Sequence, residues 1–439
     1  MNRPYFSIFA PKKTVSMLEL SYIRSNPEEV ISRLAIKNFN AKPIVDEILS
    51  IDEKRRSTQT ALDGVLAQLN KASKEIGELY KAGKKAEADA LKADTGKWKE
   101  DISALEAEAK KIETDLQAKA VLLPNAPHSS VPKGKTPEDN EVVHTEGAIP
   151  ELGEKAMPHW ELAKKYDIID FETGVKITGA GFPVYKGKGA RLQRALINFF
   201  LDKAQEAGYM EIEPPILVNE DTGFGTGQLP DKEGQMYFVN EDKLYLIPTA
   251  EVPITNIYRD MILDATSLPV KNCGYTPCFR REAGSYGKDV RGLNRLHQFD
   301  KVEIVQIRLP GESYKALEEM KEYVAGLLKS LHLPFRILKL CGGDMSFASA
   351  LTYDMEVFSG AQKRWLEVSS VSNFETFQSN RMKLRYKKDK EKPALAHTLN
   401  GSALALPRIV ASLLENNQDD KGIRIPEVLV PYTKFEYIS

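Results

Sequence analysis

The chain has 439 residues, enough for two or three domains with a sizeable buried core. Apolar residues make up 42% and charged residues 28%, a balance typical of a globular protein, and no apolar run approaches the ~18 residues that cross a bilayer. The formal net charge of −1 is not that of a strongly basic nucleic-acid binder, although one positive face would suffice in a protein of this size.

The sequence begins with a segment that carries Arg3, Lys12 and Lys13 and no acidic residue. We expect residues 1–16 to be a disordered extension, or the product of an upstream start codon, rather than a targeting peptide. A more regular sequence begins at Met17.

Apolar positions recur at alternating spacings of three and four between about residues 48 and 116, which is the pattern of a coiled-coil seam. A lysine-rich glycine turn at 81–85 separates two such runs. This predicts an antiparallel helical hairpin over about 44–120, each helix ~45–50 Å long at ~1.5 Å per residue. Periodicity alone favours a solvated structural or dimerising coiled coil. The seam positions are Ile48, Ile51, Arg55, Thr58, Leu62, Val65, Leu69, Ala72, Ile76 and Leu79, then Leu91, Thr95, Trp98, Ile102, Leu105, Ala109, Ile112 and Leu116.

A proline-rich linker at 123–132 follows the hairpin. Beyond it, short β-rich runs and amphipathic helical segments predict an α+β domain with a largely antiparallel sheet. We expect a helix at 190–207 and strands at 243–247, 302–307, 336–340 and 365–369.

The three cysteines, Cys273, Cys278 and Cys341, are too few for a disulfide framework. Their odd count favours a reducing compartment, and we expect a cytoplasmic protein. Cys273 and Cys278 could be imagined as zinc ligands. Because the sequence has no second Cys or His pair at ligand spacing, buried structural thiols are expected instead.

Two charged segments, 279–285 and 291–299, stand out in a sequence that has neither a Gly-x4-Gly-Lys-Ser/Thr phosphate loop nor a strand-linked Gly-x-Gly-x-x-Gly. We expect a mobile loop between Gly284 and Gly292, flanked by two strands. Arginines at both ends could hold phosphates in bidentate fashion, and an aromatic at the far end could stack on a base. An exposed charged hairpin is the alternative interpretation.

A third segment, 399–408, is expected to be a small-residue turn that leads into a helix, with Pro407 in its first turn. Arg408 near the helix start opposes the helix dipole unless an anion lies close by. A solvated arginine is the alternative.

Together these segments resemble the class II aminoacyl-tRNA synthetases, and within them the bacterial-type seryl-tRNA synthetases, from Met17 to about Tyr432. The helical hairpin is similar to the family's tRNA-binding arm. Residues 208–215 resemble class motif one, residues 279–299 resemble motif two, and residues 400–408 resemble motif three. The assignment to serine rests on the strings at 225–230, 248–253, 282–285 with 297–299, 369–374 and 400–402.

Three positions depart from the family pattern, which commonly has cysteine at Val371 and glycine at Ala403 and Pro407. These substitutions are expected to change the fine geometry of the site rather than the activity.

The resemblance implies a class II-type antiparallel β-sheet with helices, preceded by the hairpin. It divides the chain into an extension at 1–16, a tRNA-binding domain at 17–125 and a catalytic domain at 126–439, and it implies a homodimer through the motif-one region around Pro214. The implied reaction uses ATP and Mg²⁺ to convert L-serine to seryl-adenylate and transfers the seryl group to the 3′ end of serine tRNA. The hairpin would grip the long variable arm, and selenocysteine tRNA is a further substrate where the organism has one.

The resemblance also implies residue roles. Arg280 would bridge the serine carboxylate and the α-phosphate, Glu282 would accept from the adenine amino group, and Arg408 would bind the far phosphates. The implied serine-binding residues are Thr249, Ala250, Glu251, Arg280, Glu303, Asn400 and Ser402. The implied ATP-binding residues are Arg280, Arg281, Glu282, Arg295, Leu296, Phe299, Glu367, Val368, Ser369, Ser370 and Arg408, of which Glu367 and Ser370 would hold Mg²⁺.

Three other classes of protein are weighed against this one. A relative that activates serine for a carrier protein would lack the long hairpin. A regulatory RNA-binding paralogue with a dead active site is opposed by the intact Arg280, Glu282, Glu367 and Arg408. A structural coiled-coil protein would not need the long segment after the linker.

Overall fold

The structure is a computed structural model that describes residues 18–231, 233–282 and 291–439. The chain divides into two compact units, Met1–Ser32 with Asn40–Pro124, and Arg33–Phe39 with Asn125–Ser439. The predicted extension at 1–16 and most of the predicted mobile loop between Gly284 and Gly292 lie outside the described residues.

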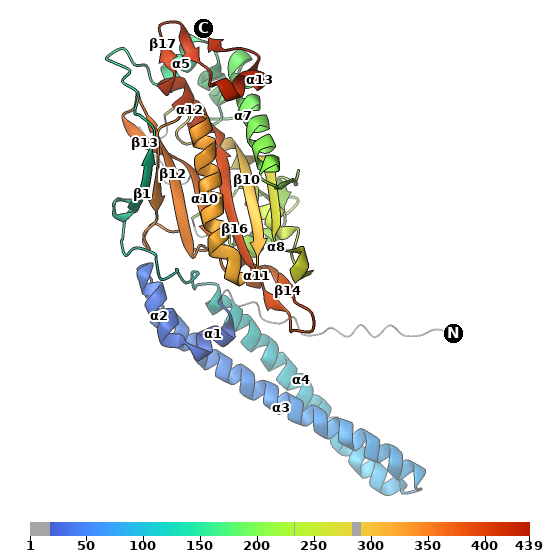
Figure 1. Ribbon diagram of the computed structural model, residues 1–439. Coiled ribbons are helices and arrows are strands. Elements are labelled where there is room, and N and C mark those ends of the chain that lie inside the picture. The colour runs from blue at the N-terminus through green and yellow to red at the C-terminus, as the bar shows by residue number, and fades with distance from the viewer. Residues whose placement is uncertain (1–17, 232, 283–290) are drawn as a thin grey trace. The chain divides into compact units, whose positions relative to one another are not determined.

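Two long antiparallel helices make up most of the first unit, as the periodicity predicts (Figure 1). Helix α3 spans Lys42–Lys81 and α4 spans Lys85–Ala120, and the short helices α1 (Leu20–Ser25) and α2 (Pro27–Ile36) precede them. Seam residues such as Ile48, Leu62 and Leu116 are buried between α3 and α4. The turn contains Gly83 at a φ of +77°, where a side chain would be strained.

An arginine at a seam position of this hairpin is explained by a buried carboxylate beside it. Asp52 is 1% exposed and pairs with Arg55 at 2.8 Å, Arg24 at 3.0 Å and Arg56 at 3.2 Å. A buried carboxylate is tolerated when it is paired and hydrogen-bonded. Arg55 therefore neutralises Asp52 rather than packing as an apolar seam residue.

An eight-stranded sheet forms the centre of the second unit, in the order β1-β11-β12-β13-β16-β10-β9-β4. All neighbouring strands are antiparallel except β4, which pairs parallel with β9. The predicted α+β class with a largely antiparallel sheet is confirmed. The bounds are β1 Glu141–Glu146, β4 Met210–Glu211, β9 Val270–Phe279, β10 Gln298–Arg308, β11 Phe335–Lys339, β12 Leu351–Ser359, β13 Arg364–Asn373 and β16 His397–Ala405.

Helices cover the two faces of this sheet differently. The long helices α7 (Gly187–Glu206), α10 (Ser313–Ser330) and α12 (Leu406–Asn416) pack in one large core with Val302 and Ile304 of β10 (Figure 1). Val305 of the same strand points to the opposite face of the sheet, where it packs with Ala250 and with Ile254 of α9 (Glu251–Asn256). The short helices α8 (Glu220–Thr226) and α11 (Phe377–Met382) adjoin α9 and β16.

The smaller elements complete the second unit. They are α5 His159–Lys165, β2 Ile169–Asp170, α6 Phe171–Ile177, β3 Val184–Tyr185, β5 Leu217–Val218, β6 Phe238–Val239, β7 Leu244–Leu246, β8 Ile262–Asp264, β14 Arg385–Lys387, β15 Ala394–Leu395, β17 Gln418–Asp419, β18 Gly422–Arg424, α13 Val430–Thr433 and β19 Tyr437–Ile438. The predicted helix at 190–207 corresponds to α7, and the four predicted strands to β7, β10, β11 and β13.

The prediction of a small-residue turn at 399–405 is wrong, because these residues form most of the central strand β16. Gly401 lies opposite Ile304 of β10 and Val371 of β13. A Cβ added at Gly401 would lie only 3.0 Å from a Val371 methyl carbon. The small residues therefore serve close packing between neighbouring strands, and the helix expected after them begins directly at Leu406.

Candidate active site

Strand β10 carries two buried charged side chains on the face opposite the large core. Lys301 is 5% exposed and Glu303 is 2% exposed, and their side chains pair at 2.6 Å. Thr249, in the loop before α9, donates its hydroxyl to Glu303 at 3.1 Å and accepts from Lys301 at 2.9 Å. These three buried residues form a closed triangle of polar contacts.

A second buried carboxylate adjoins this triangle. Glu251 begins α9, is 7% exposed, and accepts a hydrogen bond from Gln378 Nε2 at 2.6 Å. Burial, followed by the charge of Glu303, raises the pKa of Glu251 to about 7, although Gln378, Lys301 and Asn400 oppose the shift. The two acids share one buried lysine, so a further cation at this place would be favourable.

Strand β16 passes beside these acids. Its Ser402 lies in register with Glu303 of β10, and Asn400 with Val305. The Asn400 side-chain nitrogen is buried and lies near enough to Glu251 to lower the pKa of that carboxyl, but it has no partner within hydrogen-bond distance among the described residues. A buried amide left unpaired is costly, so this donor is available to a bound polar molecule.

Arg280 and Phe299 come together at the ends of the paired strands β9 and β10. The Arg280 guanidinium lies 5.3 Å from the centre of the Phe299 ring, and the backbone N–H of Arg280 donates to the His297 carbonyl at 2.9 Å. Glu282 pairs with Arg295 at 3.0 Å across the same strand ends. The two segments that flank the undescribed loop are therefore joined by a cation–π contact and an ion pair.

Arg408 links the start of α12 to both neighbouring segments. Its Nε donates to the Asn294 carbonyl at 3.1 Å and its Nη1 to the Glu367 carbonyl at 2.6 Å, with a Glu367 carboxylate oxygen 3.8 Å away. The Ser370 hydroxyl lies 3.5 Å from the Glu367 carboxylate. Segments far apart in the sequence thus meet at one guanidinium.

An additional acid lies beside Glu367 and Ser370. Asp354 of β12 is in register with Ser370, and its Oδ1 is buried without a hydrogen-bond partner among the described residues. Burial, together with the charge of Glu367, raises the pKa of Asp354 well above its ordinary value. A buried carboxylate beside an exposed one of the same charge favours a cation near the pair.

The predicted site residues lie on strands β10, β16 and β13, on the segments next to β9, β10 and β16, and, for Thr249, Ala250 and Glu251, in the loop before α9 and at its first residue. Ala250, Leu296, Val368 and Ser369 are buried there, and Arg281 stacks on the Tyr237 ring with 5.7 Å between guanidinium and ring centre. Sequence reasoning missed residues that act through these: Lys301, Gln378 and Asp354. The signal for Lys301 was its spacing of two from Glu303, which places both on one face of a strand.

Comparison with known proteins now defines the class. Residues 237–417 match the family model described as the tRNA synthetase class II core domain (G, H, P, S and T), and residues 17–127 match the seryl-tRNA synthetase N-terminal domain. The antiparallel sheet with its motif-two and motif-three arginines is thus a class II synthetase core.

Individual similar proteins show which amino acid this class II core activates. The chain is 53% identical over 425 residues to a serine–tRNA ligase of Salinibacter ruber, covering 96% of this chain and 99% of that one. It is 48% identical to the serine–tRNA ligase of Chlorobium luteolum, covering 96% and 99%. A seryl-tRNA synthetase from Pyrococcus horikoshii, solved with ATP, superposes with a TM-score of 0.89 at 33% identity, covering 95% and 98%.

The chain belongs to the seryl-tRNA synthetase family. Its activity is that of a serine–tRNA ligase: ATP is a substrate, serine is activated as seryl-adenylate, and the seryl group passes to the 3′ end of serine tRNA. The helical hairpin is the part of the chain that fits tRNA binding. No helix among the described residues is long and apolar enough to cross a membrane.

The resemblance implies that Glu251 binds serine, and with that role its raised pKa predicts a pH dependence of serine affinity. The ammonium of serine carries its charge throughout pH 6–8, whereas Glu251 gains its negative charge as the pH rises through about 7. We therefore expect the KM for serine in pyrophosphate exchange to fall severalfold between pH 6 and pH 8, because attraction to the ammonium grows. Glu251→Gln should raise the KM and flatten this profile. A profile in the variant as steep as in the wild type would contradict the assignment to Glu251.

Proposed function

We propose that the buried polar group of Thr249, Glu251, Lys301 and Glu303 selects serine, and that the arginines at the strand ends activate it. The observation that carries the proposal is the pair of buried acids served by one lysine. A substrate ammonium would supply the missing positive charge, and hydroxyl-bonding partners stand beside it at Thr249 and Glu303. A site that hydrogen-bonds a hydroxyl rejects alanine, because the buried partners would otherwise stay unpaired. Ala250, Asn400 and Ser402 would complete the serine site.

The chemistry of the first step needs positioning rather than a protein base. The serine carboxylate is already ionised and attacks the α-phosphate of ATP, forming the acyl–phosphate bond and releasing pyrophosphate. Arg280, held over the Phe299 ring, would contact both reacting groups and stabilise the charge that develops on the phosphate. In the second step the terminal hydroxyl of the tRNA attacks the carbonyl of seryl-adenylate, and AMP leaves.

The remaining ATP contacts are proposed for the residues around Arg408. Glu282 would accept from the adenine amino group and Phe299 would stack on the ring, with Arg281, Arg295 and Leu296 beside it. Arg408 would bind the far phosphates. Its guanidinium already lies 3.8 Å from Glu367, so phosphate would share the cation with that carboxylate.

We propose Glu367 and Ser370 as the residues that hold Mg²⁺, next to Val368 and Ser369. The site fits a hard cation, because Ser370 and Glu367 offer oxygen atoms 3.5 Å apart and the buried Oδ1 of Asp354 lies on the neighbouring strand without a described partner. When bound, the ion would neutralise phosphate charge. The carboxylates would keep it in place beside Arg408.

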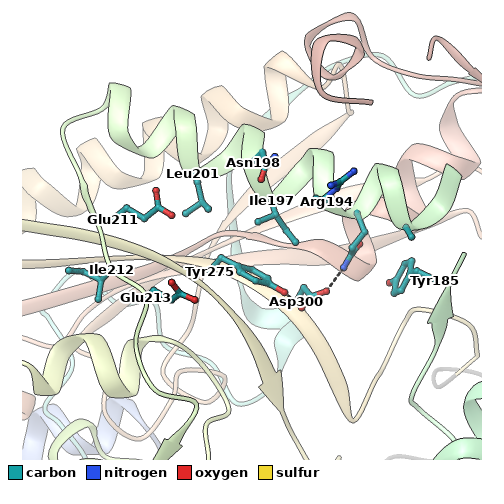
Figure 2. Close-up of a pocket in the computed structure, with 12 residues that line it drawn as sticks. Tyr185, Arg194, Ile197, Asn198, Leu201, Glu211, Ile212, Glu213, Tyr275 and Asp300 are labelled. Atoms are coloured by element: carbon teal, nitrogen blue, oxygen red, sulfur yellow. Dashed lines mark hydrogen bonds between the residues drawn. The ribbon is translucent and has the colours of Figure 1, made fainter. Parts of the chain in front are cut away.

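We propose a homodimer through the motif-one region around Pro214. A cavity of about 610 Å³ lies between α7 and the segment after β4, lined among others by Asn198, Leu201, Glu213 and Tyr275 (Figure 2). It contains none of the predicted site residues. Apolar side chains are exposed on the same segment, with Met210 57%, Leu217 40% and Ile216 36% accessible. A second copy of the chain would cover this surface.

We propose that the chain divides into a tRNA-binding domain at 17–125 and a catalytic domain at 126–439, and that the protein is cytoplasmic. The three cysteines are buried free thiols, as a protein of a reducing compartment would have.

Arg280→Ala should abolish serine activation while the protein stays folded. An arginine that contacts both substrates in the transition state is worth at least ~3 kcal/mol, or about a hundredfold in rate. Serine-dependent pyrophosphate exchange measures the loss, with circular dichroism to confirm the fold. Arg424→Ala, at an arginine whose side chain is 63% exposed, is the matched control and should leave exchange unchanged. Near-normal exchange by folded Arg280→Ala would remove Arg280 from the site.

The dimer proposal predicts a surface variant that dissociates. Met210→Glu combined with Leu217→Glu places charges on the exposed apolar segment and should shift the protein to monomer in sedimentation velocity at micromolar concentration. Val143→Glu is the control, because Val143 is 41% exposed on β1 at the opposite edge of the sheet. Dimers that persist in the double variant, or dissociation by Val143→Glu, would place the interface elsewhere.

Removal of the hairpin should separate the two chemical steps. Because α3 and α4 bury their seam against each other, replacing residues 48–116 by a short flexible turn should leave the second unit folded and exchange intact. Charging of serine tRNA should fall by orders of magnitude through weaker tRNA binding, and each lost phosphate contact should flatten the log–log salt dependence by a little under one. Candidate contacts are the exposed lysines Lys54, Lys71, Lys74, Lys81, Lys84 and Lys85.

The test measures exchange and charging side by side on the same shortened protein. A milder version, Lys81→Glu with Lys84→Glu and Lys85→Glu, keeps the helices and changes only charge at the turn. Charging at the wild-type rate and tRNA concentration dependence by the shortened protein would show that the hairpin is structural only.

A further inference from the structure

His159 is a buried histidine that contacts two distant segments of the second unit. It begins α5 and is 0% exposed. Its Nε2 accepts the backbone N–H of Leu293 at 2.8 Å, and its Nδ1 lies 2.7 Å from Oε1 of Glu415. A neutral imidazole has one donor and one acceptor nitrogen. The N–H of Leu293 therefore fixes the ring proton on Nδ1, which donates to Glu415.

Glu415 anchors this histidine from the last turn of α12. It is 0% exposed, and its carboxylate also accepts the backbone N–H of His159 at 3.0 Å, Gln362 Nε2 at 3.0 Å and the Ser359 hydroxyl. A buried carboxylate with this many donors is held in one orientation. The histidine ring is thus fixed from behind, with its acceptor nitrogen turned toward residue 293.

The backbone held by His159 is the first described segment after the undescribed residues 283–290. Gly292 has a φ of +66°, and a Cβ there would lie 2.2 Å from His159 Nε2, so the ring approaches this backbone as closely as a glycine allows. The Arg291 guanidinium lies 4.7 Å from the centre of the Trp160 ring. The first two residues of α5 therefore contact three consecutive residues, 291–293.

A second connection runs from Glu415 to the proposed ATP residues. Gln362, which donates to Glu415, accepts from Asn294 Nδ2 at 3.0 Å through its Oε1. The Asn294 carbonyl in turn accepts from Arg408 Nε at 3.1 Å, and the next residue, Arg295, pairs with Glu282 at 3.0 Å. One buried carboxylate thus supports residues 292–294 at two points, immediately before Arg295 and Leu296.

We propose that His159 and Glu415 are positioning residues for ATP: the bond from Leu293 to His159 sets the course of the chain after residue 290, so that Arg295, Leu296 and Arg408 face the nucleotide in a prearranged geometry. The proposal rests on the ATP-binding roles proposed above for these three residues. It differs from a purely packing role for His159, which would affect the stability of the protein but would not distinguish ATP from serine.

Two substitutions of His159 separate its two hydrogen bonds. Asparagine places an amide near the Nδ1 position and can donate to Glu415, but it leaves Leu293 without an acceptor. Glutamine reaches the Nε2 position and can keep the acceptor for Leu293. We expect His159→Asn to raise the KM for ATP about tenfold with little change in the KM for serine, and His159→Gln to retain most of the ATP affinity. Binding of AMP by calorimetry should weaken in the same order.

A folded His159→Asn protein with the wild-type KM for ATP overturns the proposal, and so does an equal rise of both KM values in both variants. If His159→Asn does not fold, Gln362→Met carries the test, because it removes the bridge to Asn294 and leaves His159 in place. A severalfold rise in the KM for ATP supports positioning, and an unchanged value overturns it.

Arg408→Ala, measured alongside, separates failure of the proposed ATP-binding role of Arg408 from failure of the proposed positioning role of His159. An unchanged KM for ATP in that variant refutes the proposed role of Arg408, whereas a raised one with normal His159→Asn kinetics refutes only the positioning.

Discussion

Two carboxylates share one lysine in the interior of the second unit, and the organisation of the site follows from this imbalance. Glu303 has Lys301 within 2.6 Å, whereas Glu251 depends on Gln378 and has a pKa raised to about 7. Burying charge is costly unless a partner compensates for it. In the proposed function, the ammonium of the substrate would supply the missing positive charge and its hydroxyl would bond to Thr249 and Glu303.

The antiparallel sheet is what allows such a site to form from distant segments. Strand β16 lies between β10 and β13, and Gly401 lets it approach Val371 closely, so that Ser402 is brought beside Glu303. The same strand then leads directly into α12, which carries Arg408 toward Asn294 and Glu367. The close strand packing and the position of Arg408 are therefore linked, because β16 continues directly into α12 at Leu406.

The sequence was sufficient for the features that depend on local pattern. Heptad spacing predicted the hairpin, because two seams of similar length joined by a short glycine turn pack against each other as antiparallel helices. The sequence was not sufficient where contacts between distant segments determine the local structure. Residues 399–405 were predicted as a turn because small residues are typical of turns, yet two neighbouring strands recruit them into the sheet. Gln378 and His159 gave no signal alone, since each acts through a partner more than fifty residues away.

The most direct test of the account is the amino-acid dependence of pyrophosphate exchange by the purified protein. Serine, alanine, glycine and threonine would be compared at equal concentrations with ATP and Mg²⁺, each over a range that defines kcat/KM. We expect exchange with serine and a kcat/KM for alanine lower by at least about a thousandfold, because alanine offers no hydroxyl to the buried hydrogen-bonding groups of the site. Exchange with alanine within about tenfold of that with serine would contradict the claim that this buried polar group selects the substrate.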